Sequence, residues 1–322
     1  MTYREMIEHL TAAAHMTEKE YRSHPAISRS ELWVMNQSPE KFKWAREHTK
    51  EPTPSLLFGQ VVHKLVLQPK SFQEDFAVMP SVDRRTKAGR EQYEQFLADA
   101  GMRTVISEDM YNQAHEMAAV LYSNPTAVSL LQGIKEVPLF WRDPDTGVEC
   151  KCRLDLLQSD ENGVPVIVDY KTASDASYRA FMRDVVNYGY YFQSAMYSEG
   201  VIQNGLCPRI IYGQPKKKWV KDPSTGKRKY YTEIPETIVK GGTEGKIIPP
   251  RWFFIVQEKA EPYSVNIFEM DTDFITAGYD KYRELIGTYA SCVATDYWPG
   301  YMGAFDEPNI LTLPAWLTGG DD

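Results

Sequence analysis

Two aspartates and a lysine stand at positions where they could support metal-dependent hydrolysis. Asp155 lies in one strand-like segment, and Asp169 and Lys171 end the apolar run of the next. Side chains alternate along a strand, so Asp169 and Lys171 share one face and Tyr170 takes the other. If the two strands pair as a hairpin, Asp155 lies beside Asp169. Two buried carboxylates are costly without a cation, and Mg²⁺ prefers such oxygen ligands.

A lysine beside such a cation has a clear chemical use. Lys171 could orient or deprotonate a water molecule and stabilise charge that develops on a phosphate. The Asp-x-Lys pattern by itself is also compatible with a surface hairpin that carries an ion pair. Other polar residues are equally ambiguous alone: His63 on an apolar helix, Glu136 at the start of the first strand, and Gln193 with Tyr197 at i, i+4 on one helix face.

The elements that must position these residues change in type along the chain. Residues 1–132 are predicted to be mainly helical. Residues 56–67 have apolar side chains at a helical period, and residues 88–132 are predicted as helices broken at Gly101 and Asn124. Residues 133–300 are then predicted to form an α/β core. Residues 301–322 follow it as a C-terminal tail. We expect one domain of α/β class, with a mixed β-sheet flanked by helices.

Short apolar segments separated by turns predict the strands of this core. Strands are expected at Val137–Arg142, Val148–Leu157, Val164–Lys171, Arg209–Tyr212, Arg251–Gln257 and Ser264–Met270, with helices from Tyr178 to about Gln203 and at Asp273–Thr295. The third strand is almost continuously apolar, which places it in the interior of the sheet.

The charge is distributed unevenly. The chain has 36 basic and 44 acidic residues, a net charge of −8. Residues 205–250 hold ten basic and four acidic residues, so the remainder carries about −14. Within an insertion at about 214–250, Lys216–Lys221 is expected to pair with Lys227–Tyr231 as a hairpin. This basic segment is compatible with a DNA contact, with an acidic partner, or with a solvated edge whose lysines block aggregation.

Composition excludes several classes of protein. No apolar run approaches the length of a membrane span, and the first ten residues have no apolar signal region, so we expect a cytoplasmic protein without a membrane partner. Four cysteines do not make a disulfide scaffold. Cys150 and Cys152 are expected to face the core. Because Cys207 and Cys292 have no CxxC partner, an iron–sulfur cluster is not expected.

Taken together and in order, these residues resemble the RecB-type branch of the PD-(D/E)xK nuclease superfamily. Within it, the chain is most similar to the nuclease domain of the RecE-type exonucleases (exonuclease VIII), over nearly its whole length. The matching segments are Ile27–Leu32, Phe58–His63, Asp83–Gly89, Phe140–Gly147, Cys150–Asp155 and Leu313–Leu317. Two features depart from the family: Leu154 replaces the usual proline before the metal-binding aspartate, and the basic insertion is additional.

The resemblance implies a restriction-endonuclease-like core and a role for each site residue. Asp155 and Asp169 would bind a catalytic Mg²⁺, for which Mn²⁺ would substitute, and the Tyr170 carbonyl would complete the shell. Lys171 would activate water. His63 would be a further metal ligand or hold the scissile phosphate. Glu136 would serve a second metal or orient water, while Gln193 and Tyr197 would position the active-site strand or the nucleotide.

The resemblance also implies an activity and partners. Such enzymes degrade one strand of duplex DNA from an end in the 5′ to 3′ direction and leave a 3′ overhang for recombination. We expect a homo-oligomeric ring, a tetramer rather than a trimer, that passes the overhang to a RecT-type annealing protein. The host would be bacterial, with the gene carried by a phage or prophage. Independently of the resemblance, their basic charge makes Arg84, Arg85, Lys87, Arg153, Lys216, Lys217 and Lys218 the residues expected to contact DNA.

Three alternatives stay open at this point. One is a Cas4-like or other RecB-type nuclease of different polarity, which the lack of a cysteine cluster and of a helicase motor disfavours. The second is a DNA-binding protein of the same fold without catalysis, which the complete set of metal-site residues disfavours. The third concerns only Arg84–Lys87, which is as compatible with a solvated turn as with a phosphate grip.

Overall fold

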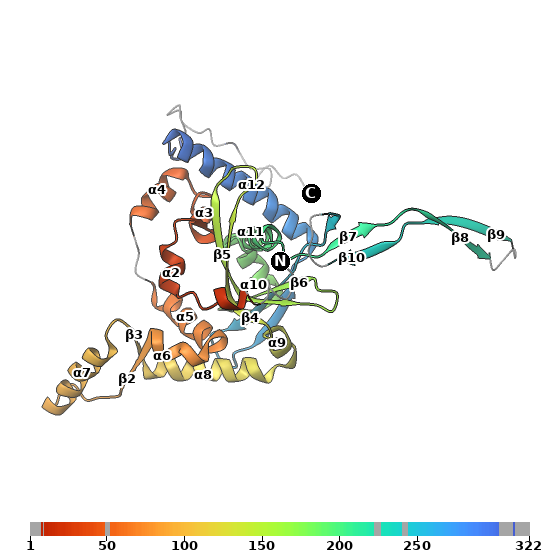
Figure 1. Ribbon diagram of the computed structural model, residues 1–322. Helices are drawn as coiled ribbons and strands as arrows, with labels where there is room; N and C mark the ends of the chain where they lie inside the picture. Colours follow the sequence, from red (N-terminus) through yellow and green to blue (C-terminus); the bar gives the residue numbers. More distant parts are fainter. Residues whose placement is uncertain are drawn as a thin grey trace.

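The structure is a computed structural model that describes residues 8, 10–48, 52–221, 227–239, 244–302 and 312. Figure 1 shows a central sheet with helices on both sides, an arm made of β8 and β9 that extends from it, and helix α7 projecting the opposite way. The Leu313–Leu317 motif and most of the expected C-terminal tail lie outside the described residues.

A six-stranded mixed sheet forms the centre of the protein. Its strands are β1 (Ile27–Ser28), β4 (Ile134–Arg142), β5 (Glu149–Ser159), β6 (Pro165–Ala173), β12 (Arg251–Glu258) and β13 (Val265–Glu269). The order is β1–β5–β6–β12–β13, with β4 paired to β5. β12 runs parallel to β6, and β5 antiparallel to it. The expected interior position of β6 is therefore confirmed.

Helices pack on both faces of this sheet. The first face carries α3 (Arg29–Val34), α10 (Tyr178–Asn187), α11 (Tyr190–Gln203) and α12 (Thr272–Thr295), and the second carries α5 (Pro54–Leu67), α8 (Glu108–Ser123) and α9 (Pro125–Leu130). The remaining described helices are α2 (Glu18–Ser23), α4 (Pro39–Glu47), α6 (Phe72–Asp75), α7 (Lys87–Ala100) and a 3₁₀ turn at Pro69–Ser71. None of the helices in the described part of the chain combines the length and apolar character that a bilayer crossing requires.

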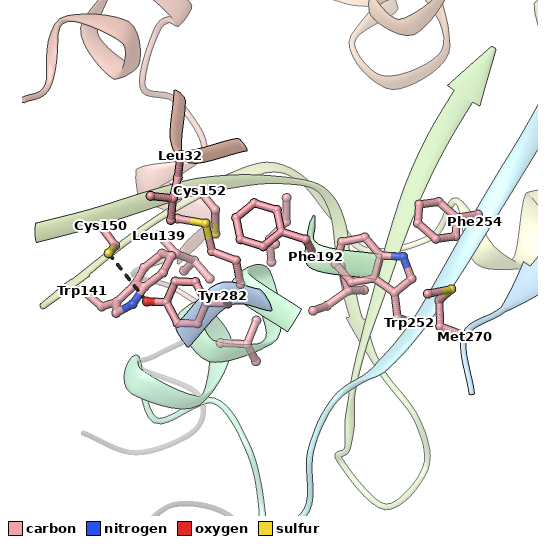
Figure 2. Packing of buried hydrophobic residues seen from close by; sticks show 14 of the residues in the cluster. Leu32, Leu139, Trp141, Cys150, Cys152, Phe192, Trp252, Phe254, Met270 and Tyr282 are labelled. Carbon is pink, nitrogen blue, oxygen red and sulfur yellow. Dashed lines mark hydrogen bonds between the residues drawn. The ribbon is translucent and has the colours of Figure 1, made fainter. Parts of the chain in front are cut away.

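The two faces enclose separate apolar cores, and β6 contributes to both by simple alternation. Val166, Val168 and Tyr170 pack in the core with α5 and α8, whereas Ile167 packs in the core with α11 and α12. Figure 2 shows the core that contains α11 and α12, where Cys150 and Cys152 lie among large side chains. Both cysteines are fully buried, which confirms that they face the core.

Three smaller sheets complete the described structure. β2 (Phe76–Met79) runs parallel to β3 (Thr104–Ser107), and β8 (Lys216–Lys221) pairs antiparallel with β9 (Arg228–Glu233). β7 (Arg209–Tyr212) lies between β10 (Glu236–Val239) and β11 (Lys246–Ile247). The expected hairpin is confirmed in its strand pairing, although Lys227 precedes the strand and the turn at 222–226 lies outside the described residues.

The structure corrects three details of the sequence prediction. The single helix expected from Tyr178 to Gln203 is two helices, because Gly189 has φ +65° and a Cβ there would stand 2.6 Å from the Trp33 ring. Strands β2 and β3 interrupt the helical region, so part of residues 88–132 is extended. β7 was expected among the strands of the core, but it joins the three-stranded sheet instead of the central one.

Candidate active site

The site lies where β5 and β6 diverge. β4 pairs with β5 along one edge, so β1 and β6 share the other edge. The β5–β6 ladder ends at the pair Leu156 and Val168, one position short of Asp155 on β5 and of Asp169 on β6. In place of a ladder bond, the backbone N–H of Tyr170 donates to Oδ2 of Asp155 at 2.9 Å. The expected juxtaposition of the two strands is therefore confirmed.

Glu136 enters the site through a distortion in β4. The β4–β5 register pairs Lys135 with Leu156 and Val137 with Leu154, but it skips Glu136. Glu136 has φ +55°, a left-handed conformation that costs of order 1–3 kcal/mol for a residue with a side chain. Its carboxyl group is nevertheless buried at 7% exposure. The strain is concentrated at the residue whose carboxylate completes the acidic cluster.

Helix α5 supplies an imidazole to this cluster. Nε2 of His63 lies 3.0 Å from Oδ2 of Asp155, and Nδ1 lies 3.5 Å from Oε1 of Glu136. Gly59, one turn earlier, allows α5 to approach β6, because a Cβ there would stand 3.3 Å from Oγ1 of Thr172. Burial would lower the pKa of His63, but the carboxylates of Asp155, Glu136 and Asp169 together outweigh it and raise the pKa to about 9. The ring is thus a cation between two acids.

Asp169 and Lys171 form the second half of the site. As the alternation predicted, they share a face, and Nζ of Lys171 lies 2.5 Å from Oδ2 of Asp169. From α11, Nε2 of Gln193 donates to the other oxygen of Asp169 at 2.5 Å. Burial raises the pKa of Asp169 to about 6. Burial would lower the pKa of Lys171, but the Asp169 charge raises it, so the lysine is a protonated counter-ion here.

The donor set fits a hard divalent cation. His63, Glu136 and Asp155 each offer a ligand atom, and these atoms all lie within 4.8 Å of one another. Asp169 adds a carboxylate on the adjacent strand. Burial raises the pKa of both Glu136 and Asp169, so the fold concentrates carboxyl groups whose ionisation a divalent cation would favour. Oxygen-rich ligand sets of this kind suit Mg²⁺ or Mn²⁺.

Two expected residues lie beside this cluster with other contacts. Tyr197 is one turn beyond Gln193 on α11 and packs edge-on against Trp252, with ring centroids 5.8 Å apart. Arg153 projects from β5, where its Nε lies 2.9 Å from Oε2 of Glu136 and its terminal nitrogen pairs with Glu18. Arg153 therefore holds Glu136 in the structure, and its expected contact with DNA stays a prediction.

The other expected DNA contacts lie on projecting elements. Arg84 and Arg85 precede α7 and Lys87 is its first residue; this helix extends away from the central sheet (Figure 1). The Arg84 guanidinium lies 4.8 Å from the Tyr93 ring centroid. Lys216, Lys217 and Lys218 are exposed on β8, in the arm on the opposite side. The structure does not bring either group into the cluster around Asp155.

Arg29 is a cation near the site that sequence analysis did not single out. It follows β1 at the start of α3, and its guanidinium lies 5.7 Å from the Trp33 ring centroid. A terminal nitrogen donates to the Tyr188 carbonyl, while its buried Nε has no hydrogen-bond partner among the residues that the structure describes. Burial lowers its pKa, although the Tyr197 and Asp169 groups act in the opposite direction. Its position inside the Ile27–Leu32 motif was the available signal.

Comparison with known proteins agrees with this geometry. A family model described as "PDDEXK-like domain of unknown function (DUF3799)" matches residues 28–211, which is more than half of the chain. The chain belongs to this PDDEXK-like family. The matched segment contains His63, Glu136, Asp155, Asp169, Lys171 and Gln193, whereas β8 and β9 lie beyond it.

A solved structure shows the same fold. It is the crystal structure of a protein named putative exonuclease from Eubacterium rectale, with 17% sequence identity and a TM-score of 0.51. The similarity covers 95% of this chain and 99% of that one. Among curated proteins, none matches the chain. The mixed sheet flanked by helices is thus a PD-(D/E)xK nuclease fold, as the sequence predicted.

Proposed function

We propose that this protein is a metal-dependent deoxyribonuclease, and specifically a RecE-type exonuclease that degrades duplex DNA from an end in the 5′ to 3′ direction and leaves a 3′ overhang. One observation carries the proposal: Asp155 and Asp169 meet just beyond the end of the β5–β6 ladder, and Lys171 contacts Asp169. Metal-dependent phosphodiester hydrolysis uses this combination of cation ligands and a polar group for water.

The roles of the residues follow from their contacts. Asp155, Asp169, His63 and the Tyr170 carbonyl would hold Mg²⁺ or Mn²⁺, which when bound supplies a Lewis acid for the phosphate and lowers the pKa of water. Gln193 fixes the orientation of Asp169 through its 2.5 Å hydrogen bond. Lys171 would orient the attacking water. Glu136 would orient His63 or serve a second cation, and Tyr197 would support the strand through α11.

Further parts of the proposal are supported by the sequence resemblance to the RecE-type exonucleases. They are action at DNA ends, the 5′ to 3′ polarity, a homo-oligomeric ring that encloses the duplex, and transfer of the overhang to a RecT-type annealing protein in the cytoplasm of a bacterium. Arg84, Arg85 and Lys87 would contact the DNA backbone. A ring of four subunits is the form we propose.

A cleavage assay on DNA of defined ends tests the proposal. A linear duplex labelled at either the 5′ or the 3′ terminus is incubated with Mg²⁺ or with EDTA, beside a covalently closed circle. We expect Mg²⁺-dependent release of the 5′ label first, with the circle left intact. Lys171→Ala should abolish release, and Lys70→Ala, at an exposed position, should not.

Other results would overturn parts of the proposal separately. Binding of DNA without cleavage in Mg²⁺ or Mn²⁺ would indicate a non-catalytic member of the fold. Early release of the 3′ label would indicate a nuclease of the opposite polarity, as in the Cas4-like alternative. Rapid digestion of the closed circle would remove the ring, since a ring must thread onto an end. Native mass spectrometry would measure the number of subunits directly.

A further inference from the structure

In the arm formed by β8 and β9, none of the residues whose side chains the structure describes is buried. All six residues of β8 are exposed, and Trp219 is 61% exposed. The two strands pair with each other over six register positions, from Lys216 opposite Glu233 to Lys221 opposite Arg228. Because a two-stranded hairpin is at best marginally stable in water, an exposed tryptophan and valine there gain little by folding alone.

The charges of the arm also work against its stability. Its two strands contain six basic residues and one acidic residue, Glu233. Lys221 and Arg228 stand directly opposite each other, and like charges in that relation destabilise a hairpin. The composition therefore fits a ligand that brings negative charge to the arm.

The two faces of the arm differ in character. Side chains alternate, and directly opposed residues share a face, so Lys217, Trp219, Lys221 and Arg228 lie on one face, which we name the basic face. None of the six residues at the three register positions of this face is acidic, and Tyr230 stands opposite Trp219.

The opposite face already contains an ion pair. Lys216, Lys218 and Val220 lie on that face together with Glu233. Nζ of Lys218 lies 3.2 Å from Oε1 of Glu233, so one of its positive charges is balanced within the arm. The three successive lysines 216–218 therefore do not present one common surface. By register, the basic face holds three basic residues and no acidic one, whereas the opposite face holds three basic residues, Lys229 among them, and one acidic residue.

We propose that the basic face binds single-stranded DNA. Its cations match phosphates, and an aromatic ring between them matches the flat face of an unpaired base. A duplex offers the same phosphates, but its bases are stacked on one another, so an exposed tryptophan at the centre of the face favours the single strand. The identification of this strand as the 3′ overhang produced by cleavage rests on the proposed function. The binding of single-stranded DNA by the arm does not depend on the proposed function.

Matched variants test the proposal by fluorescence polarisation. The probe is a labelled oligothymidylate of about 20 nucleotides, longer than a typical binding site, in EDTA so that no cleavage occurs. Trp219→Ala should weaken binding about tenfold, the loss typical of one stacked base, and Val220→Ala on the opposite face should change it little.

A pair of double variants separates the two faces by charge. Lys217→Ala with Lys221→Ala, and Lys216→Ala with Lys218→Ala, each remove two charges from the same strand. Over about 50 to 200 mM salt, the first pair should reduce the log–log salt slope by about 1.4, because each single-strand phosphate contact contributes about 0.7. The second pair should leave the slope nearly unchanged.

Several outcomes would overturn the inference. Equal losses for the two double variants would mean that the arm acts only through net charge. A larger loss for a duplex probe than for the oligothymidylate would assign the basic face to duplex DNA. No loss with either probe would leave the arm as a surface for an acidic protein. Nuclease assays on the same variants keep these results separate from the proposed function, since a catalytically inactive protein can still bind the probe.

Discussion

Nε2 of His63 lies 3.0 Å from Oδ2 of Asp155, so helix α5 supplies the counter-charge for a carboxylate on β5. The two residues are 92 positions apart in the chain, and the contact joins the helical region to the sheet. In the metal-free protein this imidazolium takes part of the role that a divalent cation would have. Removing the charge of His63 should therefore lower the folding stability of the metal-free protein.

His63→Gln should lower the free energy of unfolding in EDTA by about 1–3 kcal/mol, because the Asp155 and Glu136 carboxylates lose their cationic partner. The effect should depend on pH. The pKa of His63 is raised from 6.5 to about 9, so its stabilisation is full below about 6.5 and is lost as the pH rises through 9. Urea unfolding between these limits measures it. The exposed His15→Gln is the control, and an equal effect there would contradict the prediction.

A glycine on α12 should affect the site from a distance. A Cβ on Gly278 would stand 2.0 Å from the backbone oxygen of Tyr191, two residues before Gln193 on α11. Gly278→Ala should therefore separate the two helices, cost about 1–3 kcal/mol and reduce cleavage through the Gln193–Asp169 contact.

The same helix offers a matched control. A Cβ on Gly287 would meet no heavy atom within 4 Å. Gly287→Ala should gain about 0.5–1 kcal/mol from helix propensity alone. Thermal unfolding of both variants measures the difference, and a Gly278→Ala protein as stable as Gly287→Ala would show that the crossing of α11 and α12 is not close-packed there.

The sequence was sufficient wherever a local rule decides the structure. Alternation along β6 placed Asp169 and Lys171 on one face and Tyr170 on the other, and the structure confirms this through the Lys171–Asp169 contact and the burial of Tyr170 in the opposite core. The apolar run before Asp169 likewise predicted an interior strand. Such patterns depend only on the period of the strand and on burial of its side chains.

The sequence was insufficient where distant segments meet. No local pattern shows that Glu136 adopts φ +55° and leaves the β4–β5 ladder, or that β7 joins a separate sheet. Arg29 was missed for the same reason, since its environment consists of Trp33 and aromatic residues of α11 that are more than 150 positions away. These features result from packing, which propensity and period do not encode.

Acid should lower the free energy of unfolding because Asp143 becomes protonated. Asp143 is fully buried and bonds Tyr282 at 2.9 Å and Arg283 at 2.5 Å. Burial would raise the pKa of this carboxyl, but the hydrogen bonds from Arg283, Thr146 and Tyr282 together outweigh it and lower the pKa from 3.8 to about 2. Its stabilisation, about 2 kcal/mol, is thus present above pH 3.8 and lost as the pH falls through 2.

Asp143→Asn isolates this contribution. The variant should be less stable than the native protein at neutral pH, and the difference between the two should shrink between pH 4 and 2 because only the native side chain titrates there. Chemical unfolding at several pH values measures both curves. A constant difference across that range would mean that the Arg283 contact does not depend on the charge of Asp143.

Asp169→Asn should separate catalysis from folding more sharply than any other change in the site. The amide keeps the shape of the side chain and can still accept the Gln193 hydrogen bond, which now holds Oδ1 at 2.5 Å. Burial raises the pKa of the native carboxyl to about 6, so ionised Asp169 is unfavourable in the metal-free fold, and its replacement should change the melting temperature by only a few degrees in either direction. Cleavage should fall at least 100-fold, since a ligand of the cation is lost and Lys171 loses the carboxylate that positions it.

Cleavage rate and melting temperature are measured on the same preparation, with the exposed Asp280→Asn as the control. Cleavage near the native rate in Asp169→Asn would contradict the assignment of this residue to the site, whereas loss of cleavage together with unfolding would assign it a structural role.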